Sequence, residues 1–149
     1  MKEKISFVRG FAFDEYYKRV VLIRNRTNLR WLSMFWNGIG TQLEPGKGIR
    51  STQAQEFQKE TGVDVDVTRW TTFHFERKLL LPEIEPSIYF MTTVLTREEM
   101  ASINGKNNEV QIFNVEDVSP GMHSLHALSW LVPMAIDYHR YPSEKWVQG

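Results

Sequence analysis

The sequence contains no cysteine among its 149 residues. Disulfides, cysteine-based metal sites and a thiol nucleophile are therefore excluded. Neither charge is in excess, because 18 basic residues balance 18 acidic ones, and this balance argues against an extended nucleic-acid-binding surface. No apolar run approaches the roughly 18 residues of a membrane span, and the N-terminus lacks the apolar core of a signal peptide. We therefore expect a cytoplasmic protein that does not enter a membrane.

The residues that are present suit one globular domain. A chain of 149 residues that is 42% hydrophobic can bury a sizeable core. No internal repeat, low-complexity tract or linker rich in proline, glycine and serine divides it. We expect a single domain over residues 1–149.

Alternating apolar positions and β-branched or aromatic content predict five strands, near residues 5–13, 19–25, 70–75, 88–95 and 109–115. A C-terminal helix is predicted over much of residues 124–139, where leucines and small apolar residues form a stripe. It either begins near Leu131 or bends at Pro133. Together with a central helix, this order predicts an α+β protein with a mixed sheet and helices packed on it.

The central helix lies within residues 40–63, GTQLEPGKGIRSTQAQEFQKETGV. We expect it to begin near Ser51 or Thr52, where Thr52 and Gln55 have the form of a capping box, and to end at Gly62. The preceding segment, WNGIGTQLEPGKG, is rich in glycine and is predicted to be a loop. Such a loop can bring backbone carbonyls and N–H groups close to a metal ion or a phosphate.

Two glutamates of this helix face outward together. At about 100° per residue, Glu60 lies about 40° and Lys59 about 60° from Glu56 around the helix axis, while Phe57 and Ala54 point toward the sheet. Like charges at this spacing weaken a helix by a few tenths of a kcal/mol. A bound divalent cation would reverse that penalty, because carboxylate oxygens are suitable ligands for magnesium. A solvated helix face is the structural alternative.

Residues 41–63 resemble the Nudix box, G-x5-E-x7-R-E-U-x-E-E-x-G-U, with its spacing kept and no insertion or deletion. The upstream WNGIG segment and the strand and turn at 109–117 also look like the surroundings of that box. Four positions depart from the pattern: Thr41 replaces the glycine, Lys47 the first glutamate, Gln55 the arginine and Lys59 one of the three clustered glutamates.

The resemblance implies a fold and an activity. The fold is a Nudix-like α/β/α sandwich with a mixed sheet and a loop-helix-loop box. The implied activity is hydrolysis of a diphosphate linkage in a nucleoside diphosphate linked to another moiety, with Mg²⁺ or Mn²⁺ as cofactor. By the same resemblance, Glu56 and Glu60 match metal ligands, and the carbonyl of Gly40 is a further candidate. The partner is a small nucleotide substrate.

Charge distinguishes this box from the family pattern. Three clustered carboxylates are expected there, whereas Glu56, Lys59 and Glu60 together carry a single negative charge. At an effective dielectric constant of about 20, a unit charge about 4 Å away is worth on the order of 4 kcal/mol before solvent relaxation. We therefore expect one bound magnesium ion rather than a full cluster. Lys59 is predicted to contact a substrate phosphate in place of part of the missing metal charge.

Hydrolysis also needs a general base. Glu56 or Glu60 could serve, and so could an acid outside the box. Glu109, at the start of the last predicted strand, is our choice of external acid, and Glu76 and Glu85 are weaker candidates.

Several other residues are predicted to bind substrate. Gln55 and Lys59 belong to the box itself, and Arg24 could contact a phosphate. Trp36 could stack on a base. Arg24 belongs to a basic cluster with Arg26 and Arg30, for which a solvated turn is the alternative. Trp36 belongs to an aromatic group with Trp31 and Phe35, for which a place in the core is the alternative. His123 and His126 lack further ligands nearby and are predicted to be loop or helix-start residues.

Other functions stay open at this point. A catalytically impaired Nudix-fold protein could act as a nucleotide sensor or interaction module. A protein-binding scaffold would instead present an apolar patch around Trp130 and Trp146. The sequence leaves the base, the leaving group and the oligomeric state undetermined, with a homodimer among the open arrangements.

Overall fold

The computed structural model describes residues 3–24, 36–77, 84–103, 109–118 and 128–141. Its centre is the long strand β1 (Glu3–Phe13), which pairs in parallel along its whole length with β5 (Ile84–Val94). The opposite edge of β1 is shared: residues 6–10 pair with β3 (Ile39–Leu43), and residues 12–13 with β2 (Arg19–Ile23).

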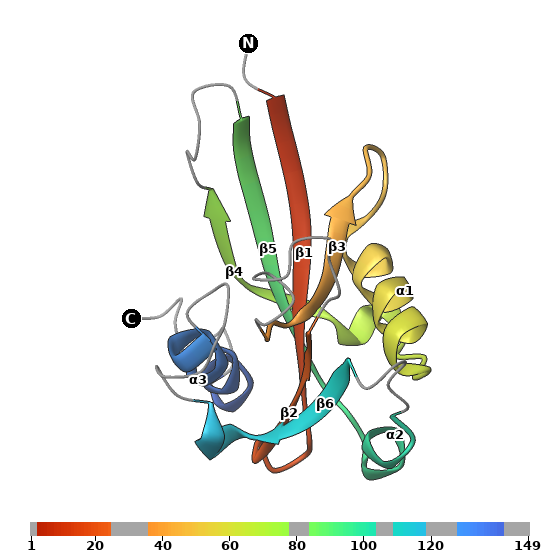
Figure 1. Ribbon diagram of the computed structural model, residues 1–149, viewed down its shortest axis with the longest axis vertical. Coiled ribbons are helices and arrows are strands. Elements are labelled where there is room, and N and C mark those ends of the chain that lie inside the picture. The colour runs from red at the N-terminus through yellow and green to blue at the C-terminus, as the bar shows by residue number, and fades with distance from the viewer. Residues whose placement is uncertain (1–2, 25–35, 78–83, 104–108, 119–127, 142–149) are drawn as a thin grey trace.

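Two more strands complete the sheet. β4 (Thr71–Arg77) pairs antiparallel with β5, and β6 (Val110–Asn114) pairs antiparallel with β2. The strand order is β4-β5-β1-β2-β6, with β3 branching from β1 (Figure 1). The mixed sheet predicted from the sequence is therefore confirmed.

Alternation along β1 divides the apolar residues between two cores. Val8 and Ala12 belong to the core on one face of the sheet, and Phe11 and Phe13 to the core on the other. All four side chains are fully buried. A strand that is apolar on both faces must lie between two layers, and helices supply both layers here.

Helix α1 (Ile49–Thr61) covers the first face with Ala54 and Phe57. It ends at Gly62, which has the left-handed conformation that glycine tolerates (φ 79°) and donates its N–H to the carbonyl of Gln58 at 2.8 Å. The expected capping box is wrong. The N-cap is Gly48, and the Thr52 hydroxyl donates to the Gly48 carbonyl at 2.7 Å, so the helix begins earlier than predicted.

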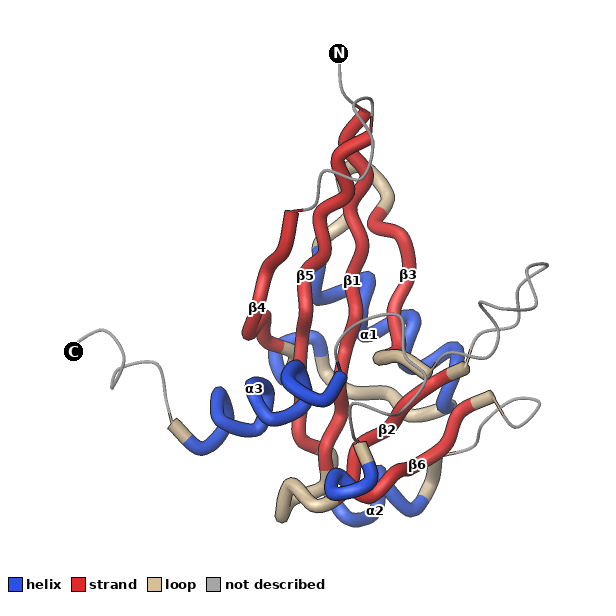
Figure 2. Tube along the Cα trace, turned by 60° about the vertical axis from the view of Figure 1, so that its left-hand side comes forward, coloured by secondary structure: helices blue, strands red, loops and turns tan. Residues whose placement is uncertain are grey.

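Helix α3 (Leu128–Arg140) covers the second face, so that the sheet lies between α1 and α3 (Figure 2). Within the described residues it begins at Leu128 rather than near Leu131, and Pro133 lies inside it. The predicted apolar stripe is buried: Leu128, Leu131, Val132, Ala135 and Ile136. No described helix has the length and apolar character needed to cross a membrane.

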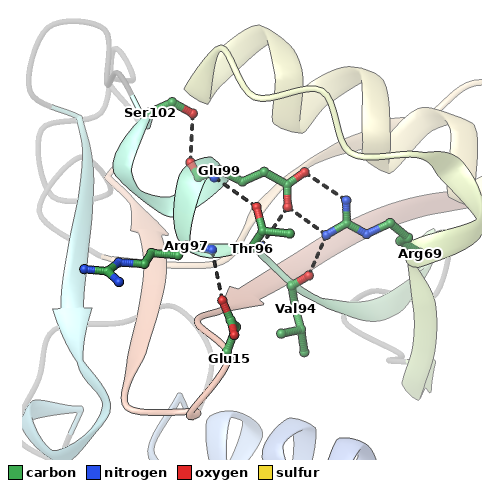
Figure 3. A network of polar contacts seen from close by, with 7 residues as sticks. All are labelled: Glu15, Arg69, Val94, Thr96, Arg97, Glu99 and Ser102. Atoms are coloured by element: carbon green, nitrogen blue, oxygen red, sulfur yellow. Dashed lines mark hydrogen bonds and ion pairs between the residues drawn. The ribbon is translucent and has the colours of Figure 1, made fainter.

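Two elements were missed by the sequence analysis. β3 lies where a loop was predicted, because its glycine suggested a turn and only its pairing with β1 reveals a strand. Helix α2 (Arg97–Ala101) is short, and a capping box of Thr96 and Glu99 begins it. Figure 3 shows Glu99 also bound by Arg69, the last residue of a 3-10 turn (Val67–Arg69). A second such turn (Val115–Asp117) follows β6.

Candidate functional site

A polar cleft of about 370 Å³ lies between β3, the turn after it and the outer face of α1. Its lining residues are Thr41, Gln42, Glu44, Lys47, Thr52, Gln55, Glu56 and Lys59. All four positions that depart from the Nudix pattern are among them. Two acids and two lysines share the cleft, so its formal charges cancel where the family pattern would be acidic.

Close packing holds α1 against the strands at this point. The Gln53 side chain is fully buried and donates from Nε2 to the carbonyl of Ile39 at 2.8 Å. A Cβ atom at Gly10 would collide with that same side chain, and one at Gly40 would run into the carbonyl of Val8. Glycine is therefore required at both positions for β1, β3 and α1 to approach as they do.

The structure brings Glu56 and Glu60 together on the exposed side of α1. Burial raises the pKa of Glu56, and the adjoining carboxyl of Glu60 raises it further through its charge and a hydrogen bond. Lys59 and Arg9 lower the same pKa by their positive charges. A half-buried carboxylate that shares its surroundings with a second one favours a cation or a proton.

Arg9 is the charged residue of this region that the sequence analysis did not identify. It lies in β1 directly opposite Gly40 of β3. Burial lowers the pKa of Arg9, and only the nearby negative charge of Glu56 counteracts that shift. A signal was present in the sequence, since Arg9 is the single charge within the apolar strand FVRGFAF. Nothing in the sequence connects it to α1, which begins forty residues later at Ile49.

Glu56 and Glu60 are the box side chains that could hold a divalent cation. Glu56 and Glu60 supply the carboxylate oxygens that magnesium prefers. The described ranges contain no group of three or more His, Cys, Asp or Glu side chains arranged to hold a metal. Lys59 and Arg9 add positive charge near Glu56, which opposes a second cation. The carbonyl of Gly40, in the edge strand β3, stays a predicted third ligand.

A second group of predicted residues meets where β2 ends. The N–H of Arg24 donates to the carbonyl of Glu109 at 2.8 Å. The Arg24 guanidinium lies over the ring of Trp36, 5.1 Å from its centroid. Trp36 is half-buried and meets Phe113 edge-on, with ring centroids 4.8 Å apart. Arg24, Trp36 and Glu109 are thus neighbours, although they are far apart in sequence.

The weaker acid candidates lie elsewhere or are only partly described. Glu76 belongs to β4, at the opposite side of the sheet from β3, and its Oε1 lies 3.1 Å from His74 Nε2. Glu85 belongs to β5. The remaining residues that the sequence analysis considered lie outside the described residues: Arg26, Arg30, Trp31, Phe35, His123, His126 and Trp146.

A second, apolar cleft of about 640 Å³ lies between α3 and β4. Its lining residues are Phe73, Ser129, Trp130, Pro133, Met134, Asp137 and Tyr138. Trp130 is 41% exposed and meets His74 edge-on, with ring centroids 5.4 Å apart. This cleft lies on the face of the sheet opposite to α1. Trp130 is the described part of the patch around Trp130 and Trp146 that a protein-binding scaffold would present, and that function stays untested.

No family model and no curated protein matches the sequence. Solved structures do match. A MutT/Nudix family protein from Enterococcus faecalis gives a TM-score of 0.73 at 12% identity, over 97% of this chain and 65% of that one. A MutT protein from work on Aliivibrio salmonicida and Vibrio cholerae gives 0.66 at 17% identity, over 89% and 95% of the two chains. MutT from Methanosarcina mazei gives 0.62 at 17% identity, over 93% and 95%. The predicted Nudix fold is thereby confirmed.

Proposed function

We propose that this chain, which has the Nudix fold, is a nucleotide pyrophosphohydrolase. Its substrate is a nucleoside diphosphate linked to another moiety, and the bond cleaved is the diphosphate linkage. The observation that carries the proposal is the contact between Glu56 and Glu60 at the polar cleft beside β3. Two carboxylates brought together in partly desolvated surroundings favour a bound cation.

The cation we propose is Mg²⁺ or Mn²⁺, held by Glu56 and Glu60 with help from the carbonyl of Gly40. When bound, it lowers the pKa of a water molecule and neutralises charge on the phosphoryl group. Lys59 and Gln55 line the same cleft and are proposed to bind and orient the substrate phosphates. An ammonium is a mobile point charge that suits a phosphate oxygen.

The general base is proposed to be Glu109, with Glu56 and Glu60 as the alternatives within the box. Arg24 and Trp36 meet beside Glu109, and we propose that they bind the part of the substrate beyond the diphosphate. One ring face of Trp36 already faces the Arg24 guanidinium, so a base would stack on the other face. A cytoplasmic location and a homodimer belong to the same proposal.

A phosphate-release screen tests the proposal. Nucleoside triphosphates, ADP-ribose, dinucleotides and sugar nucleotides are each incubated with magnesium or manganese. A pyrophosphatase converts the pyrophosphate released from triphosphates to free phosphate, and a phosphatase does the same for the phosphomonoesters released from the other three classes. We expect turnover of at least one class, and its loss by a factor of about a hundred or more in Glu60→Gln. Glu98→Gln is the matched control, because Glu98 lies exposed on α2.

The two results distinguish an enzyme from a sensor. If no substrate class is turned over with either metal while one nucleotide binds tightly, the catalytically impaired alternative replaces the enzyme. Turnover that survives unchanged in Glu60→Gln would remove the proposed metal site.

A further inference from the structure

We infer that Gln53 is a positioning residue of the proposed metal site: its buried amide fixes β3 against α1, so that the Gly40 carbonyl and the two carboxylates of the box reach the same cation. The inference rests on the proposed function, because it concerns the same metal site. It goes beyond that function, because Gln53 lies at an unspecified position of the box pattern and outside the residues that line the polar cleft.

Gln53 shares one side of α1 with the two proposed carboxylate ligands. At about 100° per residue, Glu56 lies about 60° and Glu60 about 20° from Gln53 around the helix axis. The rise of about 1.5 Å per residue places Glu56 about 4.5 Å further along the helix. Figure 1 shows α1 beside β3, with which it is in contact. The side chain that joins α1 to β3 therefore lies about one helical turn from Glu56.

The amide of Gln53 reaches the strand directly beside the third proposed ligand. Its Nε2 donates to the Ile39 carbonyl at 2.8 Å. That oxygen belongs to the planar peptide unit that joins Ile39 to Gly40, so the hydrogen bond also restrains the Gly40 Cα atom. β1 holds the same residues of β3 by strand pairing, and Gln53 adds the connection to α1. The helix and the strand of the proposed site are thus joined by this side chain.

Stability alone does not explain an amide at this position. The Gln53 side chain is fully buried, and within the described residues its Oε1 has no hydrogen-bond partner. An unpaired buried polar atom costs free energy that an apolar side chain of the same shape would avoid. β1 also lacks a side chain at Gly10, where a Cβ atom would collide with Gln53 Nε2. Residues that break a local packing rule in this way are expected at functional sites.

Accurate placement of a neutral ligand matters at this site because the cleft holds little net negative charge. Lys59 lines the same cleft as Glu56, and its positive charge opposes a bound cation. Mg²⁺ accepts only a narrow range of ligand distances and angles, so the Gly40 carbonyl contributes only if β3 is held at the right distance from α1. Contacts that orient metal ligands in this way typically contribute about ten- to a hundredfold to metal affinity.

Calorimetric titration with Mn²⁺ tests the inference. Gln53→Met keeps the approximate length of the side chain and removes the donor, and we expect it to weaken Mn²⁺ binding by about ten- to a hundredfold. Glu60→Gln identifies the signal, because it removes a proposed ligand. Thr61→Val is the matched control: it removes another fully buried polar group of α1, whose hydroxyl donates to the Phe57 carbonyl within the helix at 2.7 Å. It should lose stability and still bind Mn²⁺ as the wild type does.

A measurement on the wild-type chain decides the matter if Gln53→Met does not fold. The side-chain amides of glutamine are labelled with nitrogen-15 and followed by NMR during titration with Mg²⁺. The Gln53 amide should exchange slowly with solvent because it is fully buried, and its signal should shift until Mg²⁺ saturates the site. A Gln53 signal that stays unchanged at saturating Mg²⁺ overturns the inference.

Wild-type affinity for Mn²⁺ in a folded Gln53→Met variant also overturns the inference. So does a wild-type chain that binds no Mn²⁺, or a Thr61→Val variant that loses as much affinity as Gln53→Met. The proposed function fails separately. Weakened Mn²⁺ binding in Gln53→Met with no nucleotide turned over keeps the positioning role and removes the hydrolase. Turnover of a nucleotide with unchanged Mn²⁺ binding in Gln53→Met keeps the hydrolase and removes the positioning role.

Discussion

Two pairs of arginine and glutamate in this molecule are built in opposite ways. Arg69 binds both carboxylate oxygens of Glu99, at 2.8 and 2.7 Å, and donates to the carbonyl of Val94 at 2.8 Å (Figure 3). These contacts raise the pKa of Arg69 and lower the pKa of Glu99. Both shifts favour the charged forms, so the pair is complete without any ligand.

Arg9 and Glu56 show the reverse. Burial lowers the pKa of Arg9 and raises the pKa of Glu56, so both shifts disfavour the charged forms. The two residues attract each other without forming an ion pair. An arginine and a glutamate thus form a stabilising ion pair at Arg69 and Glu99, whereas at Arg9 and Glu56 the cost of burying the charges is only partly compensated. Under-compensated charges of this kind are found where proteins bind ligands or carry out chemistry.

The largest expected effect is that of Lys59→Glu on the polar cleft beside β3. It restores the third carboxylate of the box pattern and exchanges a positive charge for a negative one. We expect Mn²⁺ to bind more tightly by on the order of a hundredfold, because the charge near Glu56 changes by two units. Calorimetric titration with Mn²⁺ measures this, and metal-free pyrophosphate binding should weaken in the same variant. A variant that gains neither metal affinity nor turnover would show that Lys59 has no electrostatic role in the site.

Glu99→Gln and Glu56→Gln compare the two pairs directly. Glu99→Gln should lower the free energy of unfolding by about 1–2 kcal/mol, toward the smaller value because the Arg69 side chain is 35% exposed. Glu56→Gln removes a desolvated charge and should leave stability unchanged or slightly higher. Urea unfolding of both variants measures the difference. Equal losses of stability in Glu99→Gln and Glu56→Gln would contradict the claim that only Glu99 stabilises the fold through an ion pair.

Local sequence was sufficient for one part of the site. Helical periodicity alone places Glu56 and Glu60 on one side of α1, and Gly62 ends the helix where the glycine predicts. The alternating strands were also predictable, because the pattern of burial on each face is a local property. The roles of Glu56 and Glu60 in metal binding and catalysis stay predictions.

The rest of the site depends on pairing between distant segments. The approach of β1 to α1 requires Gly10, and the approach of β3 to β1 requires Gly40. Only the pairing of these distant segments reveals the need for glycine there. The same register places Arg9 opposite Gly40. β3 itself was predicted to be a loop, since a short strand containing glycine has little local signal. Long-range register is what a single sequence does not specify.

The smallest predicted effect is on the stability of the fold in acid, to which the ion pair between Arg69 and Glu99 contributes. The pKa of Glu99 is lowered in the folded chain from its ordinary value of 4.5, so the unfolded chain binds a proton first as the pH falls. The stability contributed by Arg69 and Glu99 is therefore fully present above about pH 4.5 and decreases as the pH falls through the lower folded-state value.

Arg69→Gln should flatten this acid-dependent loss of stability. Thermal melting from pH 6 to pH 3 measures it, with Arg9→Gln as the control. Because Arg9 makes no ion pair, its removal should leave Glu99 and the slope that Glu99 contributes unchanged. A slope that persists in Arg69→Gln and disappears in Arg9→Gln would mean that Arg9, and not Arg69, holds the pKa of Glu99 below its ordinary value.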